Sequence, residues 1–196
     1  TFDRDPRKSV PRFIAFAIPF GWILDPKKFD IGLDLAISKI KRISPDSVDP
    51  KVKNYHWLDL VNGMYEAYER GHYTAVLVDE ENNVLEGPGF NIFSLSKNYL
   101  ITPDKGVLEG VTRQTAIDLA IELNIAVKEA PISSEEFKNS IEAFATSTAG
   151  GIIPITKIDG RVIGNGKAGK ITKKIKDLYW KKHLHPDWSE DINDLL

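Results

Sequence analysis

Two lysines lie in the loop-like segment DPKVKNYHW, residues 49–57, just before a stretch with helical periodicity. A buried lysine has a lowered pKa, so its neutral amine can attack a carbonyl carbon and form a Schiff base. Lys51 and Lys53 are both candidates for this chemistry. The alternative is that both are solvated loop lysines, as most lysines are. The segment by itself does not choose between these interpretations.

A carboxylate stands beside glycines in LEGPGFNIF, residues 85–93. Glu86 follows the apolar Leu85 and precedes a Gly-Pro-Gly turn that leads into an apolar strand. Glycines let a ligand approach the backbone closely, so Glu86 is a candidate partner for the ring nitrogen of a cofactor. The alternative is an ordinary acid within a turn.

Two further segments combine glycines with hydroxyl residues. In GVLEGVTRQT, residues 106–115, a loop runs into a helix at Val111 and Thr112, where free backbone N–H groups can bind an anion. In ATSTAGGIIPI, residues 145–155, Thr148 is placed to donate to the same anion. The alternatives are that Thr112 is a helix N-cap and that the second segment is a tight β-turn. Together the two segments predict a phosphate cradle.

Strands and helices alternate along the chain, and hairpin signals are frequent. Strands are expected at residues 12–20, 32–43, 73–79, 84–86, 91–95, 99–102, 125–128, 141–147, 152–158 and 161–163. Helices are expected at residues 57–69, 111–123 and 168–183, with a short one capped by Ser133 and Glu136. Because hairpins dominate, this α/β (α+β) pattern predicts a mixed sheet or partial barrel flanked by helices, not a doubly wound parallel sheet.

Composition excludes several classes of protein. The 196 residues are 42% hydrophobic and 28% charged, with a net charge of −2, so neither a disordered chain nor a basic nucleic-acid binder is indicated. No apolar run is long enough to cross a membrane. The absence of cysteine excludes disulfides, thiol catalysis and cysteine-ligated metals, and it fits a reducing compartment, so we expect a cytoplasmic protein. The four histidines have no metal-ligand spacing, and no nucleotide-binding fingerprint occurs.

Taken in order, the four segments resemble the class IV aminotransferases, which use pyridoxal 5′-phosphate. That family includes branched-chain and D-amino-acid aminotransferases and aminodeoxychorismate lyases. The resemblance runs from Phe13 to Trp180 and rests on a lysine, EGPGFNIF, LEGVTR and STAGGIIPI in that order. The strings VKNYHWLDLVNGMYEA, GVLEGVTR, TAGGIIPIT and ITKKI are most similar to the (R)-selective amine transaminase branch.

The resemblance implies a fold and a role for each motif. The fold would be the large domain of fold-type IV enzymes. Lys53, which directly precedes Asn54 as in the most similar branch, would form the Schiff base with the cofactor and shuttle a proton, with Lys51 as its rival. Glu86 would pair with the pyridine nitrogen.

The remaining roles concern the phosphate, the ring face and the substrate. Val111, Thr112 and Thr148 would hold the phosphate, and Leu108 would pack against the ring. The residues that would border the substrate are Ser147, Ala149 and Gly150. Gly150 and Gly151 replace the small residue and glutamate usual in branched-chain enzymes, which favours a bulkier or less charged substrate group.

The family also has a smaller domain before this region, which supplies an arginine for the phosphate. We expect residues 1–48 to be the end of a preceding region with connecting strands, and residues 49–196 to be the C-terminal cofactor-binding domain. Arg4, Arg7 and Arg12 stand in the wrong context to replace the family arginine. The chain by itself is therefore expected to bind the cofactor weakly and to self-associate.

The resemblance thus implies an aminotransferase that moves an amino group between an amine or amino acid and a 2-keto acid. The expected partners are these small molecules and a second copy in a homodimer, with no metal, nucleic acid or membrane. Two alternatives stay open: a lyase of the same fold, and a domain that keeps the fold but is catalytically incompetent.

Overall fold

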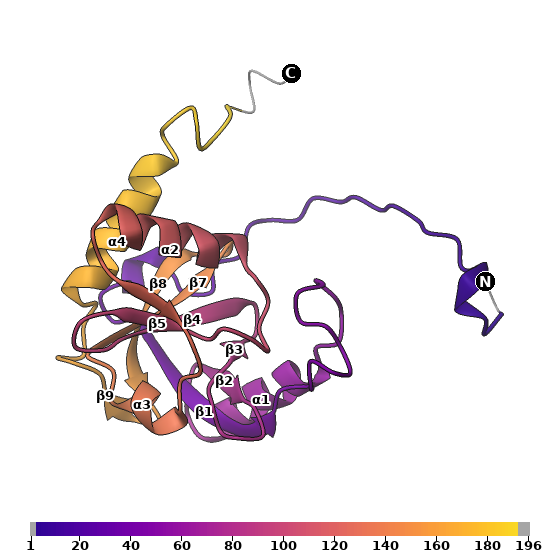
Figure 1. Cartoon of the computed structure of the whole chain (residues 1–196), viewed down its shortest axis with the longest axis horizontal. Helices are drawn as coiled ribbons and strands as arrows, with labels where there is room; N and C mark the ends of the chain where they lie inside the picture. The colour runs from indigo at the N-terminus through magenta and orange to yellow at the C-terminus, as the bar shows by residue number, and fades with distance from the viewer. Residues whose placement is uncertain (1–2, 192–196) are drawn as a thin grey trace.

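The structure is a computed structural model that describes residues 3–191 (Figure 1). Within these residues the strands are β1 (Leu33–Lys41), β2 (Thr74–Val78), β3 (Glu86–Gly87), β4 (Phe90–Leu95), β5 (Leu100–Thr102), β6 (Val127–Glu129), β7 (Glu142–Ser147), β8 (Gly151–Ile158) and β9 (Arg161–Val162). The helices are α1 (Leu58–Glu69), α2 (Val111–Glu122), α3 (Ser134–Lys138) and α4 (Lys170–Lys182), with short 3-10 turns at Pro6–Lys8 and Pro26–Lys28. No helix among the described residues is long and apolar enough to cross a membrane.

The strands form one mixed sheet in the order β2-β1-β8-β7-β4-β5-β6, with β3 on β4 and β9 on β8. The pairs β1–β2, β1–β8 and β5–β6 are parallel, and the other pairs are antiparallel. The predicted DG hairpin has positive φ at both Asp159 and Gly160, as its tight turn requires. The expected mixed sheet flanked by helices is therefore confirmed. Strand β1 precedes residue 48 but lies inside this sheet, between β2 and β8. The expected boundary at residue 48 stays a prediction.

Alternation along each strand divides the core into two faces. On the inner face of the curled sheet, Leu35, Val76, Ile92, Ala145 and Ile155 join one cluster, which is closed by side chains from the α3 region. The intervening residues point outward and pack under helices. The sheet thus curls around its own core as a partial barrel, and the outer face belongs to the helices.

The helices cover two separate areas of the outer face (Figure 1). Helix α1 packs over β1 and β2, where Leu60 and Ala67 meet Leu77. Helices α2 and α4 pack over β4, β7 and β8, around the stacked rings of Phe93 and Phe144. These two cores are distinct clusters, so the outer face between them is left for polar residues.

The strand expected at residues 12–20 is wrong. These residues run as an extended arm without strand pairing, and Phe13 is 94% exposed (Figure 1). Apolar content favours a strand only where a neighbouring strand can accept its hydrogen bonds, and none in residues 3–191 pairs with this segment. β1 is confirmed as a strand, but it is buried on both faces rather than half-buried, because it lies between parallel neighbours and under α1.

The apolar repeat that indicates α1 lies on the solvent side of that helix. Leu58, Tyr65 and Tyr68 are exposed, Leu58 by 73%. The buried face instead carries Gly63, where a Cβ would meet Leu77 at 2.6 Å. Small residues let the helix approach the sheet closely, so the larger apolar side chains stay outside.

Candidate active site

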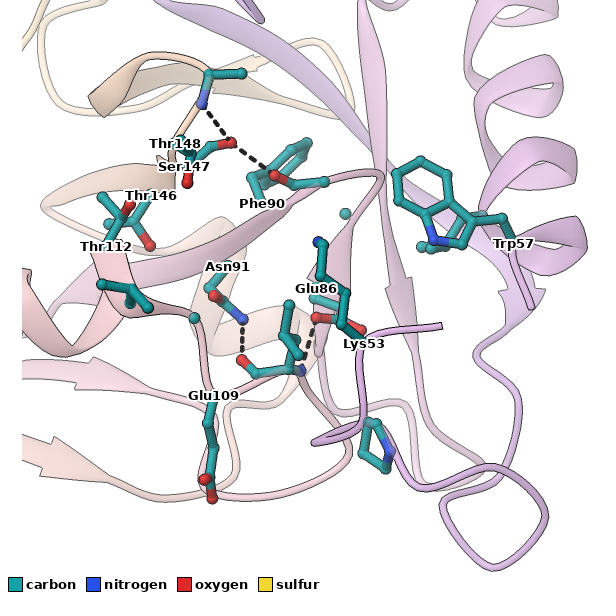
Figure 2. Close-up of a pocket in the computed structure, with 18 of the residues that line it drawn as sticks. Lys53, Trp57, Glu86, Phe90, Asn91, Glu109, Thr112, Thr146, Ser147 and Thr148 are labelled. Carbon is teal, nitrogen blue, oxygen red and sulfur yellow. Dashed lines mark hydrogen bonds between the residues drawn. The ribbon is translucent and has the colours of Figure 1, made fainter. Parts of the chain in front are cut away.

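A cavity of about 390 Å³ lies on the outer face of the sheet, bordered by the first residues of α1 and of α2. Its floor includes three polar residues in register on adjacent strands, since Glu86 on β3 pairs with Asn91 on β4, and Asn91 pairs with Thr146 on β7. Directly paired residues point to the same face of a sheet. In Figure 2 the hydroxyl residues gather toward one end of the cavity, while Glu86 and Lys53 lie at the other.

The structure separates the two candidate lysines. Lys53 lines the cavity. Lys51 is 61% exposed and its Nζ lies 2.7 Å from Glu109 Oε1, outside the cavity lining. The bond to Glu109 raises the pKa of Lys51, which keeps its amine protonated and unreactive. The geometry therefore favours Lys53 as the nucleophile.

Asn54 fixes the backbone next to Lys53. Its Nδ2 donates to the carbonyl of Val52 at 2.7 Å, and its Oδ1 accepts from His56 N at 2.9 Å. These local bonds fold the chain around the lysine between a loop and α1. The Lys-Asn dipeptide thus has a physical reason, because the side-chain amide of Asn54 stabilises the turn that carries Lys53.

Glu86 is buried and held by two donors. Its Oε2 accepts from Leu108 N at 3.0 Å, and its Oε1 accepts from Arg42 Nε at 3.1 Å. Burial raises the pKa of Glu86, and the Leu108 N–H and the Arg42 guanidinium oppose that rise. The carboxylate is thus fixed at the cavity wall rather than free in a turn, as a partner for a cationic group must be.

One end of the cavity is built from the start of α2. Gly110 is the N-cap, and no side chain caps the helix, so the alternative that Thr112 is the N-cap is wrong. Thr112 is instead the second residue of the helix and lines the cavity with Val111. A Cβ on Gly110 would clash with Asn91 Oδ1, so a larger residue there would displace the Asn91 side chain from its position between the helix start and the sheet. Asn91 Nδ2 also donates to Leu108 O at 2.8 Å, which ties the loop to the floor.

One buried hydroxyl at this end has no hydrogen-bond partner. It belongs to Thr146, and it is the one such side-chain atom recorded within residues 3–191. Thr146 follows Phe144 by two residues on β7 and so faces the side of the sheet that α2 covers. A buried polar atom without a partner is costly, which indicates that a bound group completes the site.

The turn after β7 places the remaining predicted residues. Ser147 Oγ donates to Gly89 O at 2.8 Å and accepts from Ala149 N at 3.1 Å, so its hydroxyl shapes the turn. Ser147, Thr148 and Ala149 line the cavity. Gly150 does not; it borders a neighbouring hollow with Trp22 and Trp180. The structure thus brings together eight of the nine predicted site residues, all except Gly150.

Sequence reasoning missed several residues that line the cavity or hold its walls. They are Arg42, Trp57, Asp59, Asn91 and Thr146. Trp57, Asn91 and Thr146 lie within the motifs described above, and the two-residue Pro-Gly turn that pairs Glu86 with Asn91 is a usable signal for Asn91. Arg42 and Asp59 carry no spacing signal, because their contact depends on how β1 meets α1.

A curled mixed sheet with this arrangement of helices is the architecture of the large domain of fold-type IV enzymes, which its structural neighbours share. The chain matches the model of the amino-transferase class IV family over residues 2–158, and it belongs to that family.

Relatives of this chain include branched-chain aminotransferases. A Methanocaldococcus jannaschii protein whose name places it with these enzymes is 35% identical over 193 residues, covering 97% of this chain and 65% of that protein. The Escherichia coli branched-chain aminotransferase structure superposes with a TM-score of 0.81 at 30% identity, covering 89% of this chain and 58% of that one. The Thermobaculum terrenum enzyme, solved in its PLP form, gives a TM-score of 0.76 at 33% identity, covering 81% and 53%. The chain therefore spans less than two thirds of the length of each.

Proposed function

We propose that the protein is a pyridoxal-phosphate-dependent aminotransferase that moves an amino group between an amino acid or amine and a 2-keto acid. The observation that carries the proposal is the polar row on the cavity floor, with a carboxylate at one end and hydroxyls and a helix start at the other. Two strand spacings separate Glu86 from Thr146, which is about 10 Å. That span suits a ligand with a basic ring nitrogen at one end and a phosphate at the other.

Each residue has a role that its position supports. Lys53 would hold the cofactor covalently through Nζ and, once the amine of the substrate has displaced it, would move a proton on the substrate side of the ring. Glu86 would face the ring nitrogen and Leu108 would pack against the ring, since both line the cavity. When bound, the cofactor supplies the electron sink that makes this proton transfer feasible.

The phosphate end combines a helix start with converging hydroxyls. Val111 and Thr112 offer the N-terminal N–H groups of α2, where the helix dipole favours an anion. Thr148 adds a donor from the turn after β7, and Thr146 adds the hydroxyl that lacks a partner. The phosphate would accept a hydrogen bond from this hydroxyl, which has no protein partner to give up.

Thr146→Val should separate binding from folding. Valine keeps the shape and removes the partnerless hydroxyl, so the melting temperature of the cofactor-free protein should not fall. Affinity for pyridoxal phosphate should drop roughly tenfold or more, because a hydrogen bond to a charged group is lost. Equilibrium titration and thermal unfolding measure the two effects.

The control is Thr115→Val on α2, because the Thr115 hydroxyl donates to Val111 O and its side chain does not line the cavity. It should leave cofactor affinity unchanged. If Thr146→Val binds the cofactor as tightly as the wild-type protein, Thr146 is not part of the phosphate site.

The substrate is proposed to lie beside Ser147 and Ala149, which line the cavity, and not beside Gly150, which borders the neighbouring hollow. Trp57 forms the facing wall, where its ring lies 3.7 Å from the position of a Cβ on Gly89. An aromatic wall and a glycine-lined turn favour an amine or amino acid with an apolar side group over a dicarboxylate. This is the type of substrate that the similarity to the (R)-selective branch implies.

The deciding experiment supplies the purified protein with pyridoxal phosphate, an amine or amino acid donor and a 2-keto acid, and measures the new amino acid. Transfer that requires the keto acid supports the aminotransferase. Elimination products formed without a keto acid would identify the lyase of the same fold, and cofactor binding without turnover would identify the incompetent domain.

We also propose a homodimer in the cytoplasm. The exposed apolar side chains along α1, Leu58, Val61, Tyr65 and Tyr68, form a continuous stripe that begins beside the cavity wall at Trp57. A stripe of this kind on a folded domain is typical of a protein–protein interface. Its continuity with the cavity wall favours a second copy that borders the same site.

Tyr65→Glu should weaken this dimer strongly, because it buries an unpaired charge in the interface. Sedimentation over a range of protein concentrations should show a shift toward monomer. Ile121→Glu on α2, equally exposed but off the stripe, is the control and should leave the assembly unchanged. A Tyr65→Glu protein that associates like the wild type would contradict the assignment of this face.

A further inference from the structure

Three charged side chains form a buried cluster at the Glu86 end of the cavity. Arg42 lies between two carboxylates, with Nη1 2.7 Å from Asp59 Oδ2 and Nη2 3.1 Å from Glu86 Oε1. The side chains of Arg42, Asp59 and Glu86 are 8%, 14% and 7% exposed. One guanidinium against two carboxylates leaves one net negative charge when both acids are ionised. A buried net charge of this kind is costly unless a cation lies nearby.

The other charged side chains that line the cavity show which groups can supply a positive charge to this cluster. Lys53 and Glu109 complete the charged lining within the described residues. Glu109 is paired with Lys51 at the exposed side, so neither residue supplies a positive charge to Glu86. In the cofactor-free protein Lys53 can supply this positive charge. In the cofactor-bound protein the proposed covalent link engages its Nζ. The ligand itself is therefore the source of positive charge opposite Glu86.

Backbone contacts hold the cluster in place. Arg42 N donates to Val78 O at 2.9 Å, and Ile43 N donates to Asp59 Oδ2 at 2.7 Å. Asp59 lies in the first turn of α1, next to Leu60, which lines the cavity. The end of β1 is thus tied to the start of α1, and the guanidinium faces Glu86 with Nε, which donates to Oε1, and with Nη2.

We propose that Arg42 and Asp59 are positioning residues for the ring end of the site: Arg42 aims the Glu86 carboxylate, and Asp59 keeps the cluster one charge negative, which favours a protonated ring nitrogen. The inference rests on the proposed function, since it concerns the ring of the proposed cofactor. The pKa of Glu86 responds to both residues: burial and the negative charge of Asp59 raise it, and the Arg42 guanidinium lowers it.

Asp59→Asn is the direct test, because asparagine keeps the size and can still accept from Ile43 N. The protein is loaded with pyridoxal phosphate carrying a ¹⁵N label in the ring, and the ring nitrogen is titrated by NMR. At an effective dielectric of about 20, removing a charge on the far side of a guanidinium should lower the ring pKa by about one to two units. Asp118→Asn, on the exposed side of α2, is the control and should leave the titration unchanged.

A second measurement separates charge from structure. Asp59→Asn should weaken binding of pyridoxal phosphate about tenfold, which corresponds to one pKa unit. It should change binding of an analogue with carbon in place of the ring nitrogen by less than about twofold. Arg42→Lys keeps the positive charge, but a lysine cannot span both carboxylates. It should therefore weaken the binding of pyridoxal phosphate and leave the pKa of the ring nitrogen within about half a unit of the wild-type value.

The outcomes distinguish the inference from the proposed function. An unchanged ring titration in Asp59→Asn, or equal weakening of cofactor and analogue, would overturn the role of Asp59 while leaving the function intact. A wild-type protein that binds neither compound would overturn the proposed function, and the inference with it.

Discussion

Replacing Lys53 by alanine should abolish covalent attachment of pyridoxal phosphate and reduce amino transfer by several orders of magnitude, because no other amine lines the cavity among the described residues. Lys51→Ala should leave both unchanged, since Lys51 is paired with Glu109 at the surface. Borohydride reduction followed by peptide mapping measures the attachment, and a coupled assay measures the transfer. The two variants form a matched pair, two residues apart in one loop.

A label on Lys51, or a Lys53→Ala protein that still carries the cofactor covalently, would contradict the assignment. Thermal unfolding of both variants provides the control for folding. Within residues 3–191 Lys53 forms no ion pair that its removal would break, so the cofactor-free Lys53→Ala protein should unfold close to the wild-type temperature.

Glu86→Gln should have the second largest effect. It keeps the shape of the side chain but removes the negative charge that faces the ring nitrogen. The barrier to amino transfer should rise on the order of 2–5 kcal/mol, the range for losing one partner of a buried charge pair, which is about 30- to 5,000-fold in rate. Single-turnover kinetics measure the change without a contribution from product release.

The pH dependence of Glu86→Gln gives the same test a second readout. Burial raises the pKa of Glu86, so its ionised form, and any function that needs it, is lost as the pH falls through that raised value. The wild-type rate should decline on the acid side for this reason, and Glu86→Gln should lack that decline. Near-wild-type turnover in the variant would rule out the contact with the ring.

Sequence patterns predicted the fold well where the decisive contacts are local. The capping box of Ser133 and Glu136 forms as predicted, and so does the hairpin at Asp159 and Gly160. Prediction was poorer where burial depends on distant partners. Residues 12–20 are as apolar as a core strand, yet they lie outside the sheet, because a strand is defined by its neighbours as much as by its composition.

The candidate site divides in the same way. The sequence by itself determined which segments line the cavity, since LEGPGF, GVLEGVTR and TSTAGG each encode a turn or a helix start through bonds between neighbouring residues. Only the tertiary structure decided that Lys53 rather than Lys51 reaches the cavity, that Glu86, Asn91 and Thr146 form one row, and that Arg42 bridges Asp59 and Glu86. Glu86 and Asn91 belong to one hairpin, but Arg42 lies 17 residues from Asp59 and 44 from Glu86, and Asn91 lies 55 residues from Thr146. These longer contacts depend on strand order and register, and a pattern within one segment holds no information about either.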